Sequence, residues 1–149
     1  MSRITRIVIA GFSLLLAAYP AHAANEIQPG LWQETETSEV NGKMEAPKVS
    51  TDCVSPEDAK DPVKQVQASM KDQAQQCKKL NVRQNGNVIL FEMNCGDPNQ
   101  GSIELMMTYT IHSPQRTSSI AKSTMSMMGK KIVSNVATES KWLAAACKK

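Results

Sequence analysis

The stretch CKKLNVRQNGNVILFEMNC, residues 77–95, carries the strongest structural signal in the chain. At its centre is Asn85-Gly86, a dipeptide that favours a two-residue hairpin turn. Apolar and polar residues alternate on both sides of it, as they do in strands with one buried face. A turn at this dipeptide places four residues opposite four others: Gln84 opposite Asn87, Val82 opposite Ile89, Leu80 opposite Phe91 and Lys79 opposite Glu92. The stretch therefore predicts an antiparallel β-hairpin with one apolar face.

The same alternation recurs on both sides of this hairpin. Strands are predicted over residues 31–40, 48–53, 101–111, 117–127 and 130–142, and Asn41-Gly42 predicts a turn after the first of them. The longest alternation places five residues on one face: Ile103, Leu105, Met107, Tyr109 and Ile111. Because successive strands joined by tight turns pair with each other, these segments predict about seven antiparallel strands in a meander.

A helix is predicted after the second strand. Ser55 is a suitable N-cap and Pro56 suits the first helical position, while Asp61-Pro62 offers a second start. Three apolar residues then recur at helical spacing before residue 74: Val63, Val66 and Met70. The chain therefore predicts a mainly β domain with one inserted helix. We expect an up-and-down barrel or half-barrel, loosely lipocalin-like, because curling removes exposed strand edges.

The first 23 residues have the parts of a secretory signal peptide. Arg3 and Arg6 form a basic region, residues 7–18 are largely apolar, and Ala21-His22-Ala23 matches a cleavage site. Cleavage leaves residues 24–149 as one domain, and it lowers the net charge from +3 to about +1 because both arginines are removed. No cysteine follows the cleavage site. We therefore expect a periplasmic protein with no membrane anchor after cleavage and no affinity for nucleic acid.

Four cysteines remain after cleavage: Cys53, Cys77, Cys95 and Cys147. An even number in a small exported domain predicts two disulfides, and no C-x-x-C pattern points to a redox or zinc site. The predicted hairpin register places Cys95 on the apolar face and Cys77 on the opposite one, which disfavours a bridge between them. We therefore expect the bridges Cys53–Cys77 and Cys95–Cys147.

Several short motifs resemble the exported bacterial proteins grouped as domain of unknown function 3617. They are Pro29-Gly30-Leu31-Trp32, Cys53-Val54-Ser55-Pro56-Glu57-Asp58-Ala59, the cysteines that open and close the central hairpin, a strand rich in Met, Thr and Ser, and a final Lys-Trp-Leu segment before Cys147. The resemblance spans roughly residues 29–147. It implies a periplasmic, disulfide-bonded, β-rich domain, with no established activity, no cofactor and no catalytic residues to transfer.

The residue types needed for catalysis are sparse. His112 is the one histidine left after cleavage, and it falls at a strand end on the more polar face, without the partners of a nucleophile triad. Glu34 and Glu36 share a strand face, but nothing in the sequence marks either for a raised pKa, so we expect a solvated pair. We therefore expect no enzyme and assign no catalytic residue.

Two groups of residues are candidates for binding. Met125 and Met127 share a strand face, and with Met106 on the preceding strand they could bind Cu(I) or Ag(I) through soft thioether sulfurs. The alternative is that these methionines fill gaps in an irregular core. An apolar pocket is predicted from five residues: Leu80, Phe91, Leu105, Tyr109 and Trp142. Its alternative is an interior completely filled by side chains.

These observations favour a monomeric, non-enzymatic binding protein without a cofactor. Its expected partner is an envelope protein or a small apolar ligand. Soft-metal binding through the methionines is the first alternative. Inhibition of an enzyme that attacks the cell envelope is the second, and it rests on fold-level analogy.

Overall fold

The computed structural model describes residues 26–64, 67, 77–97 and 101–147, so the predicted signal peptide, Val66 and Met70 lie outside the described residues. Residues 62–64 and 67 are helical, as the second start at Asp61-Pro62 predicts, and the described residues otherwise form eight strands and the short helix α1. In chain order these are β1 (Gly30–Val40), β2 (Lys43–Met44), β3 (Lys48–Val54), α1 (Pro56–Lys60), β4 (Cys77–Asn85), β5 (Val88–Asp97), β6 (Gly101–Ser113), β7 (Arg116–Met127) and β8 (Lys130–Ala144). The mainly β prediction is confirmed, and the short strand β2 is additional to it.

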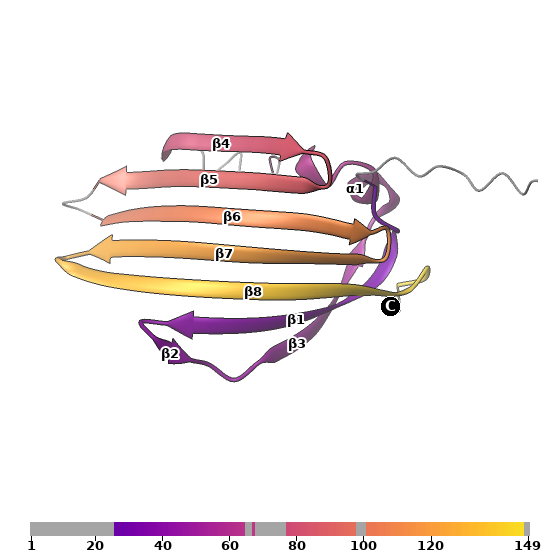
Figure 1. Ribbon diagram of the computed structural model, residues 1–149, viewed down its shortest axis with the longest axis horizontal. Helices are drawn as coiled ribbons and strands as arrows, with labels where there is room; N and C mark the ends of the chain where they lie inside the picture. The colour runs from indigo at the N-terminus through magenta and orange to yellow at the C-terminus, as the bar shows by residue number, and fades with distance from the viewer. Residues whose placement is uncertain (1–25, 65–66, 68–76, 98–100, 148–149) are drawn as a thin grey trace, which may run out of the picture.

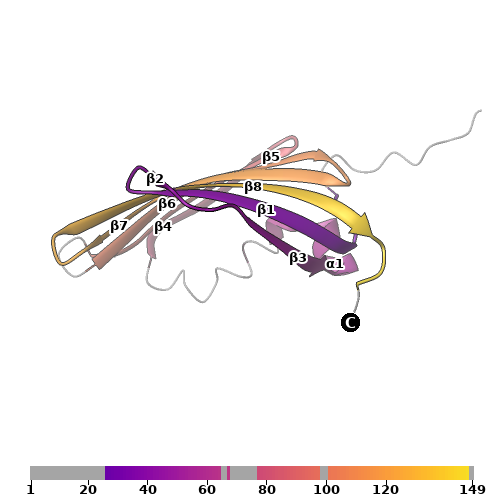
Figure 2. The same cartoon turned by 90° about the horizontal axis from the view of Figure 1, so that it is seen from below.

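All eight strands belong to one antiparallel sheet in the order β2-β1-β8-β7-β6-β5-β4, with β3 also paired to β1 (Figure 1). Strands β4 to β8 form the predicted meander. The last strand then pairs with the first, so the segment after β3 carries the chain from one sheet edge to the other. The sheet curls strongly without closing (Figure 2). Of the two predicted forms, a closed barrel and a half-barrel, the structure is therefore the half-barrel.

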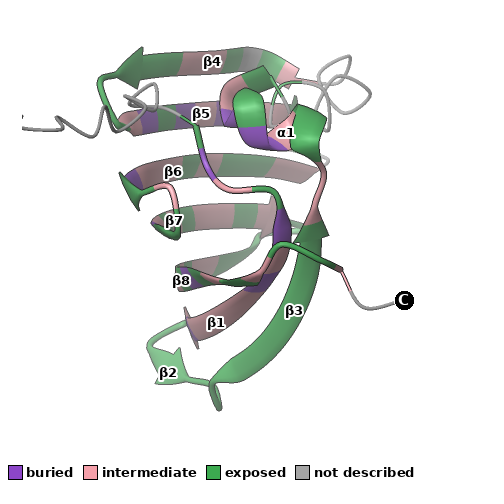
Figure 3. Cartoon of the chain, turned by 90° about the vertical axis from the view of Figure 1, so that its right-hand side faces the viewer, coloured by how far each residue is buried: buried purple, intermediate pink, exposed green. Residues whose placement is uncertain are grey.

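The pairing register assigns each side chain to one sheet face, because residues directly opposite each other point to the same side. The side that carries Trp32 and Ile111 faces α1, inside the curl of the sheet (Figures 2 and 3). We call it the concave face and the other side the convex face. Along β5, concave residues Ile89, Phe91 and Met93 are buried while convex Leu90 is exposed. The apolar face that the sequence alternation predicts is therefore the concave face of the sheet.

One end of the concave face is closed by α1. A core of Ile27, Trp32, Ala59 and Ile111 packs there against Val54, Tyr109 and Trp142. The helix begins where predicted, since the Ser55 hydroxyl accepts a hydrogen bond from the Asp58 amide at 3.1 Å. The Ile27 amide donates to the Ala59 carbonyl at 3.0 Å, which ties the lead segment to the helix. Full burial of each large apolar side chain contributes about 1.5–3 kcal/mol.

The central hairpin is present, but its register differs from the prediction. Asn85 pairs with Val88, so Gly86 and Asn87 form the turn and Val82 lies opposite Phe91 instead of Ile89. Correspondingly, Leu80 lies opposite Met93, Gln84 opposite Ile89 and Lys79 opposite Asn94. Asn85 prolongs the strand instead of entering the turn. The apolar face is unchanged, because the pairing moves by an even number of residues.

Both predicted disulfide pairings are wrong. The bridges are Cys53–Cys147 and Cys77–Cys95. The register shifts between Cys77 and Lys79, which leaves one extra residue in β4 and places Cys77 directly opposite Cys95. This irregularity turns Cys77 to the concave side. The other two cysteines then join β3 to the C-terminal segment.

Candidate functional site: the concave face

The five residues predicted to line a pocket all lie on the concave face. Strands β4, β5, β6 and β8 contribute them: Leu80, Phe91, Leu105, Tyr109 and Trp142. Their burial differs, since Phe91 is 1% exposed whereas Leu80 is 38% exposed. Phe91 therefore belongs to the packed interior. Tyr109 and Trp142 are half-buried, pack against the core at the α1 end and form an apolar, aromatic wall, whereas half-buried Leu105 lies level with Ser134, far along β8 from Trp142.

The part of the concave face that lies on β1 and β3 is polar and acidic. Glu34 and Glu36 of β1 pair with Ser50 and Lys48 of β3, and Asp52 lies opposite Trp32. The register places all of these side chains on the concave side. The face is thus divided between an apolar wall and an acidic rim.

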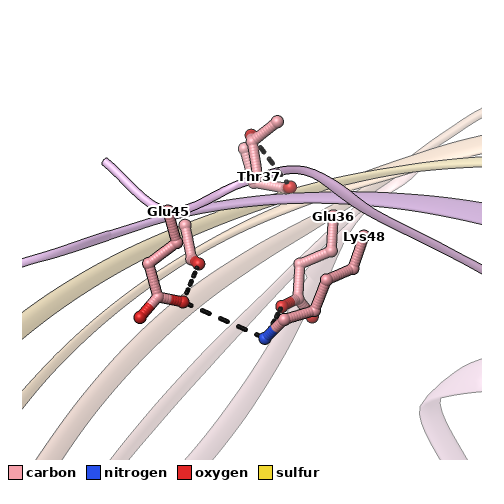
Figure 4. A network of polar contacts seen from close by, with 6 residues as sticks. Glu36, Thr37, Glu45 and Lys48 are labelled. Carbon is pink, nitrogen blue, oxygen red and sulfur yellow. Dashed lines mark hydrogen bonds and ion pairs between the residues drawn. The ribbon is translucent and has the colours of Figure 1, made fainter. Parts of the chain in front are cut away.

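Glu36 belongs to a local charge network. The Lys48 Nζ lies 3.8 Å from a Glu36 oxygen and 3.9 Å from a Glu45 oxygen, and the Ser38 hydroxyl donates to Glu45 at 2.7 Å (Figure 4). The pairs are solvent-exposed, so each contributes at most about 1 kcal/mol to stability. One lysine therefore balances part of the acidic rim.

Glu34 differs from its neighbour. Its pKa is raised, mainly by burial and further by the charges of Asp52 and Glu36, while a hydrogen bond from Ser140 opposes the increase. No cationic side chain among the described residues lies within ion-pair distance of it. The sequence-based expectation of an ordinary solvated pair is therefore wrong for Glu34. The reason is non-local, because β8 covers it through the buried Ser140 opposite.

A row of polar groups connects Glu34 to the aromatic wall. Ser140 lies opposite both Glu34 and Thr117, and the side chains of Ser140 and Thr117 are buried. Burial also raises the pKa of Tyr109, a hydrogen bond with Thr117 opposes this, and the charge of Glu34 adds to it. The charge of Glu34 therefore reaches Tyr109 across the concave face. No sequence signal links them, because their proximity depends on the pairing of β1 with β8.

The three candidate metal-binding methionines are not brought together. Met125 lies opposite Ile103 and shares the concave side with Met127, whereas Met106 lies opposite Lys122 on the convex side. Met125 and Met127 instead line a surface depression of about 220 Å³ together with Ile103. Among the residues that the structure describes, no group of three or more His, Cys, Asp or Glu could hold a metal ion.

His112 is exposed on the convex side, as its sequence position predicts. Its Nε2 lies 2.7 Å from the Ser118 hydroxyl oxygen.

A larger, open depression of about 620 Å³ lies at the same end of the sheet and has a polar lining that includes Gln33, Arg116 and Lys141. In the described part of the chain no helix is long and apolar enough to cross a membrane.

The N-terminal Pro-Gly-Leu-Trp motif, the motif that begins at Cys53 and the C-terminal Lys-Trp-Leu motif gather at the end of the sheet that α1 closes, whereas Cys77 and Cys95 lie toward the other end. The Trp32 indole donates to the Gln28 carbonyl at 2.8 Å, and the Trp142 indole donates to the Pro29 carbonyl at 3.0 Å. Trp32 lies opposite Trp142, and Cys53, which lies opposite Leu31, is bonded to Cys147. These residues hold the lead segment, helix and C-terminus together. The motifs therefore describe how this end of the domain is built, and Trp142 is the one residue that they share with the predicted pocket.

Comparisons with known proteins identify the family of the chain. No curated protein matches the sequence. Among solved structures, the S-type phycobiliprotein lyase CPES from Guillardia theta aligns with a TM-score of 0.34 and 5% identity, over 78% of this chain and 88% of that chain. That likeness is too low to support an argument about function. Residues 27–147 match the family described as "Protein of unknown function (DUF3617)", and the chain therefore belongs to that family.

Proposed function

We propose that the protein is a periplasmic, non-enzymatic binding domain whose concave face holds a small amphipathic ligand with a cationic group. The observation that carries this proposal is Glu34, a half-buried carboxylate with a raised pKa and no cationic partner among the described side chains. A ligand cation would remove the repulsion that Asp52 and Glu36 exert on it. A group kept in an unfavourable setting is a reasonable candidate for a binding role.

The apolar wall supports the second half of the proposal. Tyr109 and Trp142 are half-buried on the same face as Glu34 and pack against the same core. Aromatic rings attract cations by about 0.5–2 kcal/mol, and the apolar side chains suit an alkyl or aryl body. The acidic rim and the wall together match an amphipathic cation better than the wholly apolar ligand expected from sequence.

The titration behaviour of Tyr109 does not favour a general acid or base role for this residue. A general acid or base works best with a pKa close to the working pH. The pKa of Tyr109 is raised from 10, which moves it further from neutrality. Two disulfides are typical of oxidising compartments, which supports export to the periplasm.

The test is a tryptophan fluorescence titration with dodecyltrimethylammonium below its micellar concentration. Dodecyl sulfate and dodecyl maltoside serve as anionic and neutral probes of the same chain length. We expect saturable binding of the cation, weakened about tenfold or more in Glu34→Gln. Glu139→Gln is the matched control, because Glu139 lies on the convex side and forms only an exposed pair with Arg116 at 3.5 Å. Equal affinities for all three probes, or an unchanged affinity in Glu34→Gln, would contradict the proposal.

A further inference from the structure

The end of the sheet opposite α1 carries a protruding hairpin. Strands β7 and β8 remain paired as far as Met127 and Lys130, and Met128 and Gly129 form the turn. The pairing of β1 with β8 stops at Ser134, so the last residues of this hairpin extend past the β1–β2 hairpin (Figure 1). We call residues 126–131, Ser-Met-Met-Gly-Lys-Lys, the Met–Lys tip.

The tip is unusually apolar for a hairpin turn. Met128 is 90% exposed and Met127 is 53% exposed. Two more exposed apolar side chains, Met125 and Ile132, lie opposite each other directly behind them. Ile103 continues this surface onto β6, around the depression of about 220 Å³. The apolar surface is therefore continuous from the turn onto the neighbouring strands, as at sites that contact another apolar phase.

The backbone at the tip would suit a different residue. Met128 has φ 50°, in the left-handed region that bulky residues rarely adopt. The corresponding turn residue between β1 and β2 is Asn41, with φ 51°, followed like Met128 by glycine. Asparagine is the ordinary choice at this position. A methionine held there at a conformational cost points to a role for its exposed side chain.

The tip itself and the strands β7 and β8 that form it carry only positive charge between Leu105 and Thr138. Residues 105–138 contain no Asp or Glu, and the basic residues in that range are Arg116, Lys122, Lys130 and Lys131. Lys130 and Lys131 are exposed, and their ammonium groups form no ion pair or hydrogen bond with the described residues. The neighbouring strands carry Asp97 and Glu104, and Glu104 accepts a hydrogen bond from Asn94 at 3.4 Å. Exposed methionines flanked by free lysines match a surface that is anionic outside and apolar beneath.

We propose that the Met–Lys tip docks onto the surface of an anionic phospholipid bilayer. Met127 and Met128 enter the boundary between headgroups and acyl chains, and Lys130 and Lys131 contact the phosphate groups. The C-terminal residues of the described chain lie at the other end of the sheet (Figure 1). Docking through the tip therefore leaves the α1 end directed away from the bilayer. This proposal does not depend on the ligand proposed for the concave face.

The first experiment is co-sedimentation with vesicles of phosphatidylglycerol and phosphatidylcholine, and with vesicles of phosphatidylcholine alone. The protein is purified after export, with the absence of residues 1–23 checked by mass, because a retained signal peptide would itself bind lipid. We expect binding to the anionic vesicles. Lys130→Gln with Lys131→Gln should weaken it about 25-fold, from about fivefold for each lysine. Met127→Ser with Met128→Ser should weaken it about tenfold or more.

Matched controls use the same residue types elsewhere. Met106 is 62% exposed on the convex side, and Lys141 is exposed near the other end of β8. Met106→Ser and Lys141→Gln should leave vesicle binding unchanged. The proposal is overturned if these controls weaken binding as much as the tip variants do. It is also overturned if the unmodified protein does not bind anionic vesicles, which is the result expected if the tip contacts a protein.

Met128→Asn separates a lipid-binding role from a structural one. Asparagine suits the left-handed turn, so this variant should have an equal or higher melting temperature. Its affinity for anionic vesicles should fall because the apolar side chain is lost. A lower melting temperature together with unchanged vesicle binding would show that Met128 serves the fold and would overturn the proposal.

Discussion

Removing the bridge Cys53–Cys147 should destabilise the protein more than removing Cys77–Cys95. The first bridge closes a loop of sequence separation 94 and the second one of separation 18. In the chain-entropy relation these separations correspond to about 4.7 and about 3.2 kcal/mol at 25 °C. The expected difference is therefore about 1.5 kcal/mol. It arises in the unfolded chain, which gains more freedom when the longer loop is opened.

The two bridges also differ in what they hold in the folded state. Cys95 lies in the meander, where β5 pairs along its length with β6. Cys53 lies in the exposed strand β3, which pairs with β1 along one side only, and Cys147 follows the end of β8. Loss of Cys53–Cys147 therefore also frees the C-terminal segment. This effect has the same direction as the difference in loop entropy.

The assay is equilibrium urea unfolding of two variants, Cys53→Ala with Cys147→Ala and Cys77→Ala with Cys95→Ala. Double replacement avoids a free thiol that could form a new bridge. The urea midpoint should be lower for the first variant, with similar slopes for both. Complete unfolding of the first variant without urea, while the second remains folded, would agree with the same order. Equal midpoints, or a lower midpoint for the second variant, would refute the reasoning.

Three further predictions concern single residues. Glu34→Gln should raise the free energy of unfolding at pH 7. The pKa of Glu34 is higher in the folded state than in the unfolded state, so the ionised carboxylate destabilises the fold once the pH has risen through both values. The gain measured by urea unfolding should therefore vanish in acid. Ser55→Ala should cost about 1 kcal/mol of unfolding free energy, because the Asp58 amide loses its hydrogen-bond acceptor, and an unchanged urea midpoint would count against the cap. Gly30→Ala should lower the melting temperature more than Gly42→Ala does: both glycines have positive φ, but a Cβ at Gly30 would collide with the Ala144 carbonyl oxygen, whereas Gly42 has open space.

Local patterns in the sequence were sufficient for the strands. The alternation over residues 101–111 covers β6 except for its last two residues, and the Asn41-Gly42 turn lies between β1 and β2. Ser55 caps α1 as its position predicts. These features depend on residues close together in sequence. The turn of the central hairpin lies one residue later than predicted. Asn85 can adopt either a turn or a strand conformation, and here it prolongs β4.

The remaining features depend on pairing between distant segments. The contact of β1 with β8 buries Ser140 beside Glu34, and no local pattern in residues 31–40 indicates it. The irregularity between Cys77 and Lys79 reverses the side to which Cys77 points, and with it both disulfide assignments. The separation of Met106 from Met125 follows from the register between β6 and β7. Each of these features is decided by the register between strands that no local pattern specifies, and at Cys77 a single step in pairing changes the face.

The most direct test of the proposed binding role is native mass spectrometry of the exported protein, purified without detergent. We predict a monomer with the mass of residues 24–149 less about four protons for two disulfides, carrying an adduct of a small organic cation. The same preparation of Glu34→Gln should lack most of this adduct. A bare protein in both preparations, or an adduct that is equally abundant in Glu34→Gln, would contradict the account.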